Sequence, residues 1–319
     1  MNNETITYNK TVKFAKITAV ASTALAAVIA LAYFFALRFD FDYAIGHFER
    51  GSALFYVLVG AIIAAVVLPA AAALFSQKKA SIGALPAPAG APTFIAVFAS
   101  AMATFAFVSA IGDVSAHVIT SKLALCATFG LIVIALAMIA TVIPKTSTSQ
   151  IAQIALTLAV VAMALEILAA YFDQTLPLNS PVRYVTMLAE ISMMFFFLSE
   201  ARLAFGTTKV GERETSARAT FPFFVFANST AGALALGFSA GALAHELIPG
   251  GSHASTAQHP PVLRLAMYAS LGALALVRAY SIDKLSTEYV PLPEDAKKES
   301  DGGASSDSTD NGPDTTDEN

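Results

Sequence analysis

Residues 151–172, IAQIALTLAVVAMALEILAAYF, and residues 182–205, VRYVTMLAEISMMFFFLSEARLAF, are two apolar runs separated by the short segment DQTLPLNSP at 173–181. A helix needs about 20 mostly apolar residues to cross a hydrocarbon core of about 30 Å. Proline, asparagine and serine in the connecting segment are typical of a tight turn. The stretch therefore predicts two antiparallel membrane helices joined by a turn.

The same kind of run recurs along the rest of the chain. The 319 residues are 56% hydrophobic and 13% charged, with a mean hydropathy of +0.64, whereas about a quarter of the residues in ordinary soluble domains are charged. The sequence thus predicts an all-α protein, a polytopic transmembrane helix bundle of about eight spans. The predicted spans are 14–37, 53–75, 93–111, 123–143, 151–172, 182–205, 220–247 and 262–280.

The charges divide the chain into three predicted parts. We expect a cytoplasmic N-terminal segment at 1–13, an eight-helix transmembrane domain at 14–282 and a disordered acidic cytoplasmic tail at 283–319. Residues 285–319 hold ten acidic residues and two lysines, with few large apolar groups, a composition that cannot bury enough apolar surface to fold. The tail is interpreted as a solvated segment, and docking to a basic protein partner is the alternative.

The orientation prediction rests on lysine and arginine, which concentrate in cytoplasmic segments of membrane proteins. With the N-terminus inside, the inner segments hold twelve of the 17 lysines and arginines of residues 1–284, and the outer segments hold five. Both termini are therefore expected in the cytoplasm.

Acidic residues inside the two opening runs are the main functional clue. In an antiparallel helix pair, residues whose numbers have the same sum lie at the same depth. By this rule Asp173 is level with Arg183, where we predict an outer ion pair, and Glu166 is level with Glu190, about 10 Å deeper. Two ionised carboxylates at one depth in a low dielectric repel, so a shared proton, a protonated group or a bound cation is expected there.

Two interpretations of Glu166 and Glu190 stay open. Ionisable groups inside a membrane are functional candidates, and a proton- or cation-coupled transporter needs this chemistry. Alternatively, each carboxyl group is neutral and joins neighbouring helices by hydrogen bonds as a structural contact. Glu200 and Arg202 are expected at the inner interface, in a surface ion pair and as a snorkelling arginine.

The run at 220–247 is longer than a span requires, and its polar centre is followed by several glycines. Tilt explains the length, but broken helices with polar, glycine-rich centres also line transport sites. Asn228 in this centre is the third residue of the candidate intramembrane polar site, beside Glu166 and Glu190. Gly237 and Gly241 are spaced as in a helix-packing groove.

Motifs for the commonest catalytic sites give no support for an enzyme. The letters GFSAG at 237–241 match the nucleophile-elbow pattern, but that motif requires a strand, a turn and a helix, which this apolar run does not offer. There is no nucleotide-binding P-loop sequence and no zinc-protease motif. We therefore expect no cofactor. All five histidines fall on the predicted outer side, but their spacings match no standard zinc pattern.

The segment YFDQTLPLNSPVRY at 171–184, together with SEARLAFG at 199–206, resembles a group of uncharacterised multi-pass membrane proteins of Gram-positive anaerobic bacteria. The likeness covers mainly residues 171–206. It implies a location in the bacterial plasma membrane and carries over no activity and no catalytic residue.

The sequence thus predicts an integral membrane protein in contact with the lipid bilayer and not with nucleic acid. The most specific function that it suggests is a small-solute or cation/proton-coupled transporter. The alternative is a membrane scaffold or sensor that acts through its cytoplasmic tail and loops. A polar cavity at Glu166, Glu190 and Asn228 would favour transport, and a solid apolar interior would favour the alternative.

Overall fold

The computed structural model describes residues 3–42, 45–49, 51–75, 90–116, 121–143, 150–173, 180–207, 214–248 and 260–281. All of them belong to one compact unit, residues 1–288, and the predicted tail at 283–319 lies outside the described residues. The described elements are almost all helical. They are α1 (Asn3–Phe35), η1 (Ala36–Asp40), β1 (Phe41–Asp42), β2 (His47–Phe48), α2 (Ala53–Phe75), α3 (Ala91–Ser115), α4 (Lys122–Val142), α5 (Gln150–Phe172), α6 (Pro181–Thr207), α7 (Glu214–Ala231), η2 (Gly232–Leu236), α8 (Gly237–Leu247) and α9 (Val262–Tyr280).

Eight stretches of these helices, within the described residues, are long and apolar enough to cross a membrane. They run from Val12–Asp40 to Val262–Tyr280, and each corresponds to one predicted span. The all-α, eight-span prediction is therefore confirmed. The chain is an integral membrane protein.

Local sequence explains where several helices begin. Gly90 precedes α3 with a φ of 72°, which a glycine adopts without strain, and a proline follows in the first turn of α3. Proline also opens α6 at Pro181, where its fixed φ suits a helix and its missing N–H is not needed. The hydroxyl of Ser180, the residue just before α6, is buried and has no hydrogen-bond partner among the described residues, so Ser180 does not cap this helix through its side chain.

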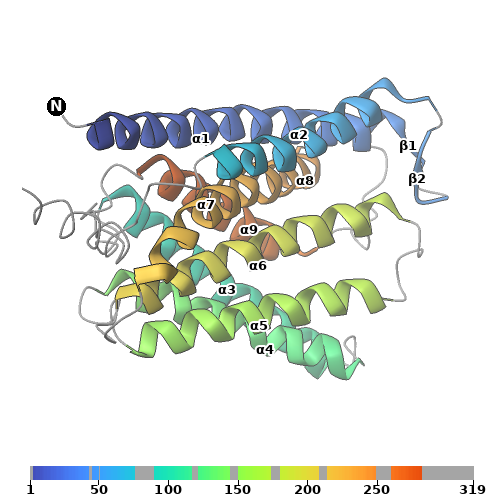
Figure 1. Ribbon diagram of the computed structural model, residues 1–319. Coiled ribbons are helices and arrows are strands. Elements are labelled where there is room, and N and C mark those ends of the chain that lie inside the picture. The colour runs from blue at the N-terminus through green and yellow to red at the C-terminus, as the bar shows by residue number, and fades with distance from the viewer. Residues whose placement is uncertain are drawn as a thin grey trace, which may run out of the picture. The chain divides into compact units, whose positions relative to one another are not determined.

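The helices have two ends, which we name by the elements that lie there. The terminal end holds the start of α1 and the end of α9, where the Lys16 ammonium lies 5.5 Å from the centre of the Tyr280 ring. The hairpin end holds the short antiparallel pair β1 and β2, as Figure 1 shows. Helix α9 packs against α1, α3, α6, α7, η2 and α8. Helix α9 therefore packs against at least four of the other seven spans.

The seventh span is built from α7, the π-helical segment η2 and α8. The wider η2 turn begins at Gly232, which is packed against α9: a Cβ added there would lie 2.3 Å from Leu276 Cγ. Gly241 in α8 meets α1 in the same way, since an added Cβ would lie 2.7 Å from the Ala30 carbonyl oxygen. The glycines at 237 and 241 thus form a packing groove against α1, as their spacing predicts.

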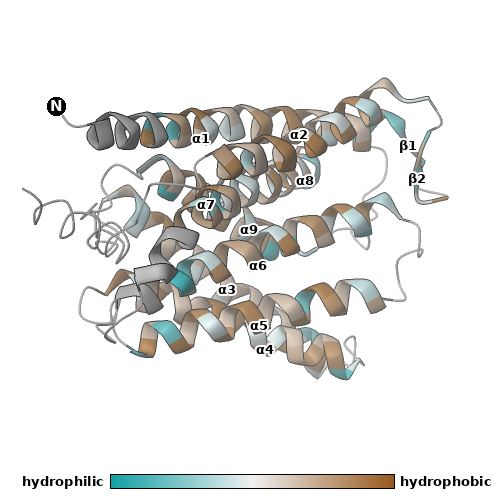
Figure 2. Cartoon of the chain, in the orientation of Figure 1, coloured by the Kyte–Doolittle hydropathy of each residue, from teal (hydrophilic) through white to brown (hydrophobic). Residues whose placement is uncertain are grey.

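Large apolar side chains cover the outside of the bundle. Exposed examples on different spans are Ile63, Phe94, Leu136 and Ile154, and Figure 2 shows hydrophobic stretches on α2, α5 and α6. Soluble proteins rarely expose contiguous apolar surfaces of this kind. The exterior is therefore suited to contact with lipid, and the candidate polar residues Glu166, Glu190 and Asn228 are buried inside the bundle.

Candidate functional site

One face of α9 carries the groups that the two central glutamates meet. Arg264 and Tyr268 are four residues apart, so they lie one above the other on the same side of the helix. Glu166 from α5 and Glu190 from α6 approach this face from two neighbouring helices. These four residues are the polar cluster.

Glu166 makes a charged hydrogen bond at one side of the polar cluster. Arg264 Nη1 donates to Glu166 Oε2 over 2.9 Å, and the glutamate side chain is only 2% exposed. Its other oxygen, Oε1, is buried and has no hydrogen-bond partner among the described residues. The ion pair thus gives a hydrogen bond to one carboxylate oxygen of Glu166 and leaves the other oxygen buried without one.

Glu190 has a different partner. The Tyr268 hydroxyl donates to Glu190 Oε1 over 3.0 Å, and both residues are buried. Glu190 Oε2 makes no hydrogen bond with any described residue. A phenol donates a hydrogen bond but brings no positive charge, so Glu190 is satisfied as an acceptor and not as an anion.

The charges of the polar cluster do not cancel. Glu166, Glu190 and Arg264 are close enough to interact electrostatically, but within the described part of the chain the guanidinium forms an ion pair with Glu166 and none with Glu190. With both carboxylates ionised, the cluster carries one negative charge in excess. A buried charge without a counter-charge costs several kcal/mol, roughly, in a protein interior.

Sequence reasoning found the two glutamates and missed their partners. The sequence analysis used Arg264 only as one of the positive charges of the outer segments. Tyr268 is one aromatic residue in an apolar span and was not singled out. Their spacing of four residues was the available signal. The depth rule, however, applies only to helices joined by a short turn, and α9 is joined to neither α5 nor α6.

Asp173 and Arg183 lie together at the turn between α5 and α6. The Arg183 guanidinium donates to the backbone carbonyl oxygen of Asp173 and, over 3.3 Å, to that of Tyr171. Arg183 is 2% exposed. The arginine therefore fastens the end of α5 to the start of α6 through the backbone.

Asn228 lies in a different part of the bundle from the two glutamates. Its amide nitrogen donates to Ser199 Oγ over 3.3 Å and to the Phe224 carbonyl oxygen over 3.0 Å. Ser199 follows Glu190 by nine residues on α6, which is about 13 Å along a helix axis. The structure thus brings Glu166 and Glu190 to one face of α9, but it does not bring Asn228 to them.

Glu200 corrects the expectation of a surface ion pair. It is 6% exposed, and the Arg278 guanidinium binds both of its oxygens, at 3.2 Å and 2.7 Å. The expectation was wrong because Arg278 comes from the last span, which the sequence does not place beside α6. Arg202 is exposed and lies 4.4 Å from the centre of the Phe223 ring.

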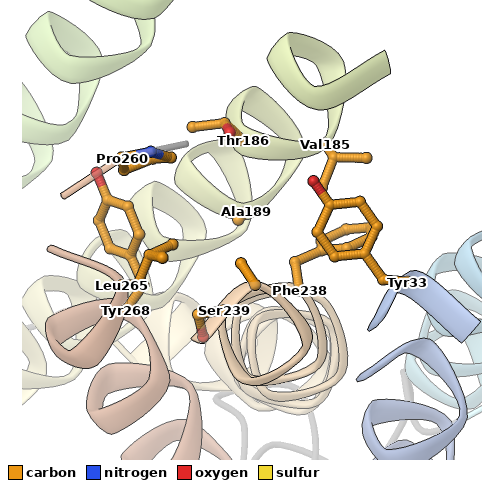
Figure 3. A pocket seen from close by; sticks show the side chains of 10 residues that line it. Tyr33, Val185, Thr186, Ala189, Phe238, Ser239, Pro260, Leu265 and Tyr268 are labelled. Carbon is orange, nitrogen blue, oxygen red and sulfur yellow. The ribbon is translucent and has the colours of Figure 1, made fainter. Parts of the chain in front are cut away.

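A small pocket borders the polar cluster on the side of α1 and α8. Its volume is about 20 Å³, enough for about one water molecule. Figure 3 shows the rings of Tyr33 and Tyr268 on opposite sides of this pocket, with Thr186 of α6 above and Ser239 of α8 below. The Ser239 hydroxyl donates to the backbone carbonyl oxygens of Ala235 and Leu236 in its own span, so it does not stand ready as a nucleophile.

A larger cavity lies on the other side of the polar cluster, near the hairpin end. It measures about 250 Å³ and lies between α3, α4, α5 and the start of α9. Arg264 lines it, so the same side chain joins this cavity to Glu166. Its wall residues are Ala106, Ser109, Ala110, Asp113, Ala124, Ala127, Ala169, Pro261, Leu263 and Arg264.

The predicted outer-side histidines lie mostly outside the described residues. Of the five histidines, His47 and His245 are described, and no group of three metal-ligating side chains gathers among the residues that were placed. Comparison with known proteins gives no relative: no protein-family model, no curated protein and no solved structure matches the chain.

Proposed function

We propose that this integral membrane protein is a transporter of small solutes coupled to protons or a small cation, and that the polar cluster carries the coupling charge. We further propose that it lies in a bacterial plasma membrane with both termini in the cytoplasm. The charge bias of twelve to five supports this orientation, and the resemblance at residues 171–206 supports the location.

The observation that carries the proposal is the missing positive charge. Of the two buried carboxyl groups, Glu166 pairs with the Arg264 guanidinium, and among the described residues Glu190 receives only the neutral hydroxyl of Tyr268. A proton or a small cation at Glu190 would complete the charge balance. Because a carboxyl proton and a bound small cation both exchange readily, either can arrive from one side of the membrane and leave on the other, which is the requirement for coupling.

The surroundings of the polar cluster support exchange with an aqueous phase. Arg264 connects the cluster to the 250 Å³ cavity near the hairpin end, and Tyr268 connects it to the small pocket between α1, α6 and α8. A contact that served only to hold helices together would need no such space. In known transporters, sites of this kind lie between helices.

The proposal is tested by charge movement that needs no knowledge of the solute. Proteoliposomes adsorbed to a conducting support are exposed to a step in external pH, or in sodium concentration, and the transient current is recorded. The intact protein should give a displacement current because a charge enters the membrane. Glu190→Gln should abolish it, and the exposed hairpin variant Glu49→Gln should leave it unchanged.

Two results would contradict the proposal. One is an intact protein that gives no displacement current with either ion, which would favour a scaffold or sensor. The other is a current that survives unchanged in Glu190→Gln, because the moving charge would then bind elsewhere.

A further inference from the structure

The larger cavity is big enough to hold more than solvent. On the same scale one water molecule needs about 10–15 Å³, and this cavity offers about 250 Å³. Half of its wall residues are alanines, whose small side chains leave the space open. The apolar wall is interrupted by three polar residues, Ser109, Asp113 and Arg264.

Asp113 and Arg264 face the cavity with opposite charges and without touching. They interact electrostatically, but no ion pair within 4.0 Å joins them. Among the described residues the Arg264 guanidinium has a single hydrogen-bond partner, Glu166, and only through Nη1. Asp113 has no hydrogen-bond partner in the described part of the chain. Both charges therefore keep bonding capacity for a molecule in the cavity.

The positions of the two charges are not explained by helix stability. Asp113 lies in the last turn of α3, and Arg264 lies in the first turn of α9. The helix dipole favours cations at a C-terminus and anions at an N-terminus, and the opposite arrangement is unfavourable by about 0.3–1 kcal/mol for each charge. Each charge thus lies at the unfavourable end of its helix and beside the same cavity.

We propose that this cavity binds a small zwitterion of the amino-acid class. The carboxylate of the ligand is held by the free donors of Arg264, its ammonium group is held by Asp113, and a small side chain lies against the alanines of α3 and α4. This inference rests on the proposed function, because it names the class of solute that the transporter carries. It also makes Arg264 the link between the solute and Glu166, the carboxylate that interacts electrostatically with the coupling residue Glu190.

Two simpler ligands distinguish a site that uses both charges from a site that uses only one. A monocarboxylate needs only Arg264, and a primary amine needs only Asp113. If one charge alone made the site, one of these half-ligands would bind as well as the complete zwitterion. If both charges act together, neither half-ligand competes well.

The test is equilibrium dialysis of the purified full-length protein in detergent with radiolabelled glycine, L-alanine, L-serine and L-valine, one at a time. At least one should bind saturably. For that amino acid, propionate and ethylamine should compete poorly. Asp113→Asn should weaken its binding by about tenfold or more, the effect of losing one charged contact, while Glu49→Gln should bind as the unchanged protein does.

The proposal is overturned if none of the four amino acids binds, if propionate or ethylamine competes as well as the unlabelled amino acid, or if Asp113→Asn binds normally. Asp113 is exposed, so its amide variant is expected to fold. The pH-step current requires no solute, so a normal current with failed binding would refute this inference and leave the proposed function standing. The loss of both would refute the two together.

Discussion

At the scale of single residues, Glu166 and Glu190 differ in their contacts: Glu166 pairs with a charged arginine and Glu190 with a neutral tyrosine. The equal depth predicted from the sequence makes them equivalent, so replacing either glutamate with glutamine would be expected to relieve the repulsion between the two carboxylates. The contacts change this expectation, because Glu166 neutralises Arg264 and Glu190 neutralises nothing. The two residues should therefore respond in opposite directions to the same substitution.

Glu166→Gln should lower the free energy of unfolding by roughly 2 kcal/mol, because it leaves the Arg264 guanidinium without its charged acceptor. Glu190→Gln should be neutral or stabilising, since an amide still accepts from Tyr268 and removes the excess charge. Both are measured by denaturant unfolding of the detergent-solubilised protein at one fixed pH. Equal losses of stability in the two variants would show that the charges are not arranged as described.

At the scale of elements, close packing of glycine faces holds α1, the seventh span and α9 together. The glycines of α8 allow its backbone to approach α1, and Gly232 and Gly272 do the same between η2 and α9. In a bilayer, helices associate through such van der Waals contact because lipid is as apolar as the helix surface.

Gly241→Ala should destabilise the protein by about 1–3 kcal/mol, the usual cost of forcing extra volume into a packed interface. The new methyl group would meet the Ala30 backbone, which cannot rotate away as a side chain can. The matched control is Gly60→Ala on α2, where no atom lies within 4 Å of the added group. The control should be neutral or slightly stabilising, because alanine favours helix over glycine.

Thermal unfolding of both variants in the same detergent gives the comparison. Equal melting temperatures for Gly241→Ala and the unchanged protein would mean that α1 and α8 are not in close contact.

The elements also show what the sequence determines and what it leaves open. Span positions follow from the length of apolar runs, so all eight were predictable. The turn between α5 and α6 is short, so counting placed Glu166 near Glu190, with which it interacts electrostatically. The positions of Arg264, Tyr268 and Arg278 did not, because no short connection fixes how α9 is rotated against α5 and α6. Asn228 was grouped with the glutamates by its polarity, and chain connectivity gave no depth for it relative to them.

At the scale of the whole molecule, orientation in the membrane is tested by labelling. Ser115 at the hairpin end and Gln150 at the terminal end are both exposed, unlike Ser180, which is fully buried. In a Cys126→Ala background, Ser115→Cys should react with an impermeant thiol reagent in intact cells. Gln150→Cys should react only after the cells are permeabilised. The reverse pattern would place both termini outside.

In the proposed mechanism, Arg264 connects the larger cavity, where the solute would bind, to Glu190, which would carry the coupling charge. A zwitterion in the cavity would draw on Arg264, the same group that neutralises Glu166. Weakening of that pair raises the negative charge around Glu190 and favours the uptake of a proton or cation there. Solute binding and charge binding would thus depend on each other through a single guanidinium.

The most direct test of the central claim is the infrared spectrum of the purified protein in a choline buffer without alkali cations. In that medium a proton is the available small positive charge, so the account predicts a carbonyl band of a protonated carboxyl group in the intact protein. Glu190→Gln should remove this band, and Glu49→Gln should retain it. A spectrum without the band, or a band that is unchanged in Glu190→Gln, would contradict the claim that Glu190 carries the missing charge.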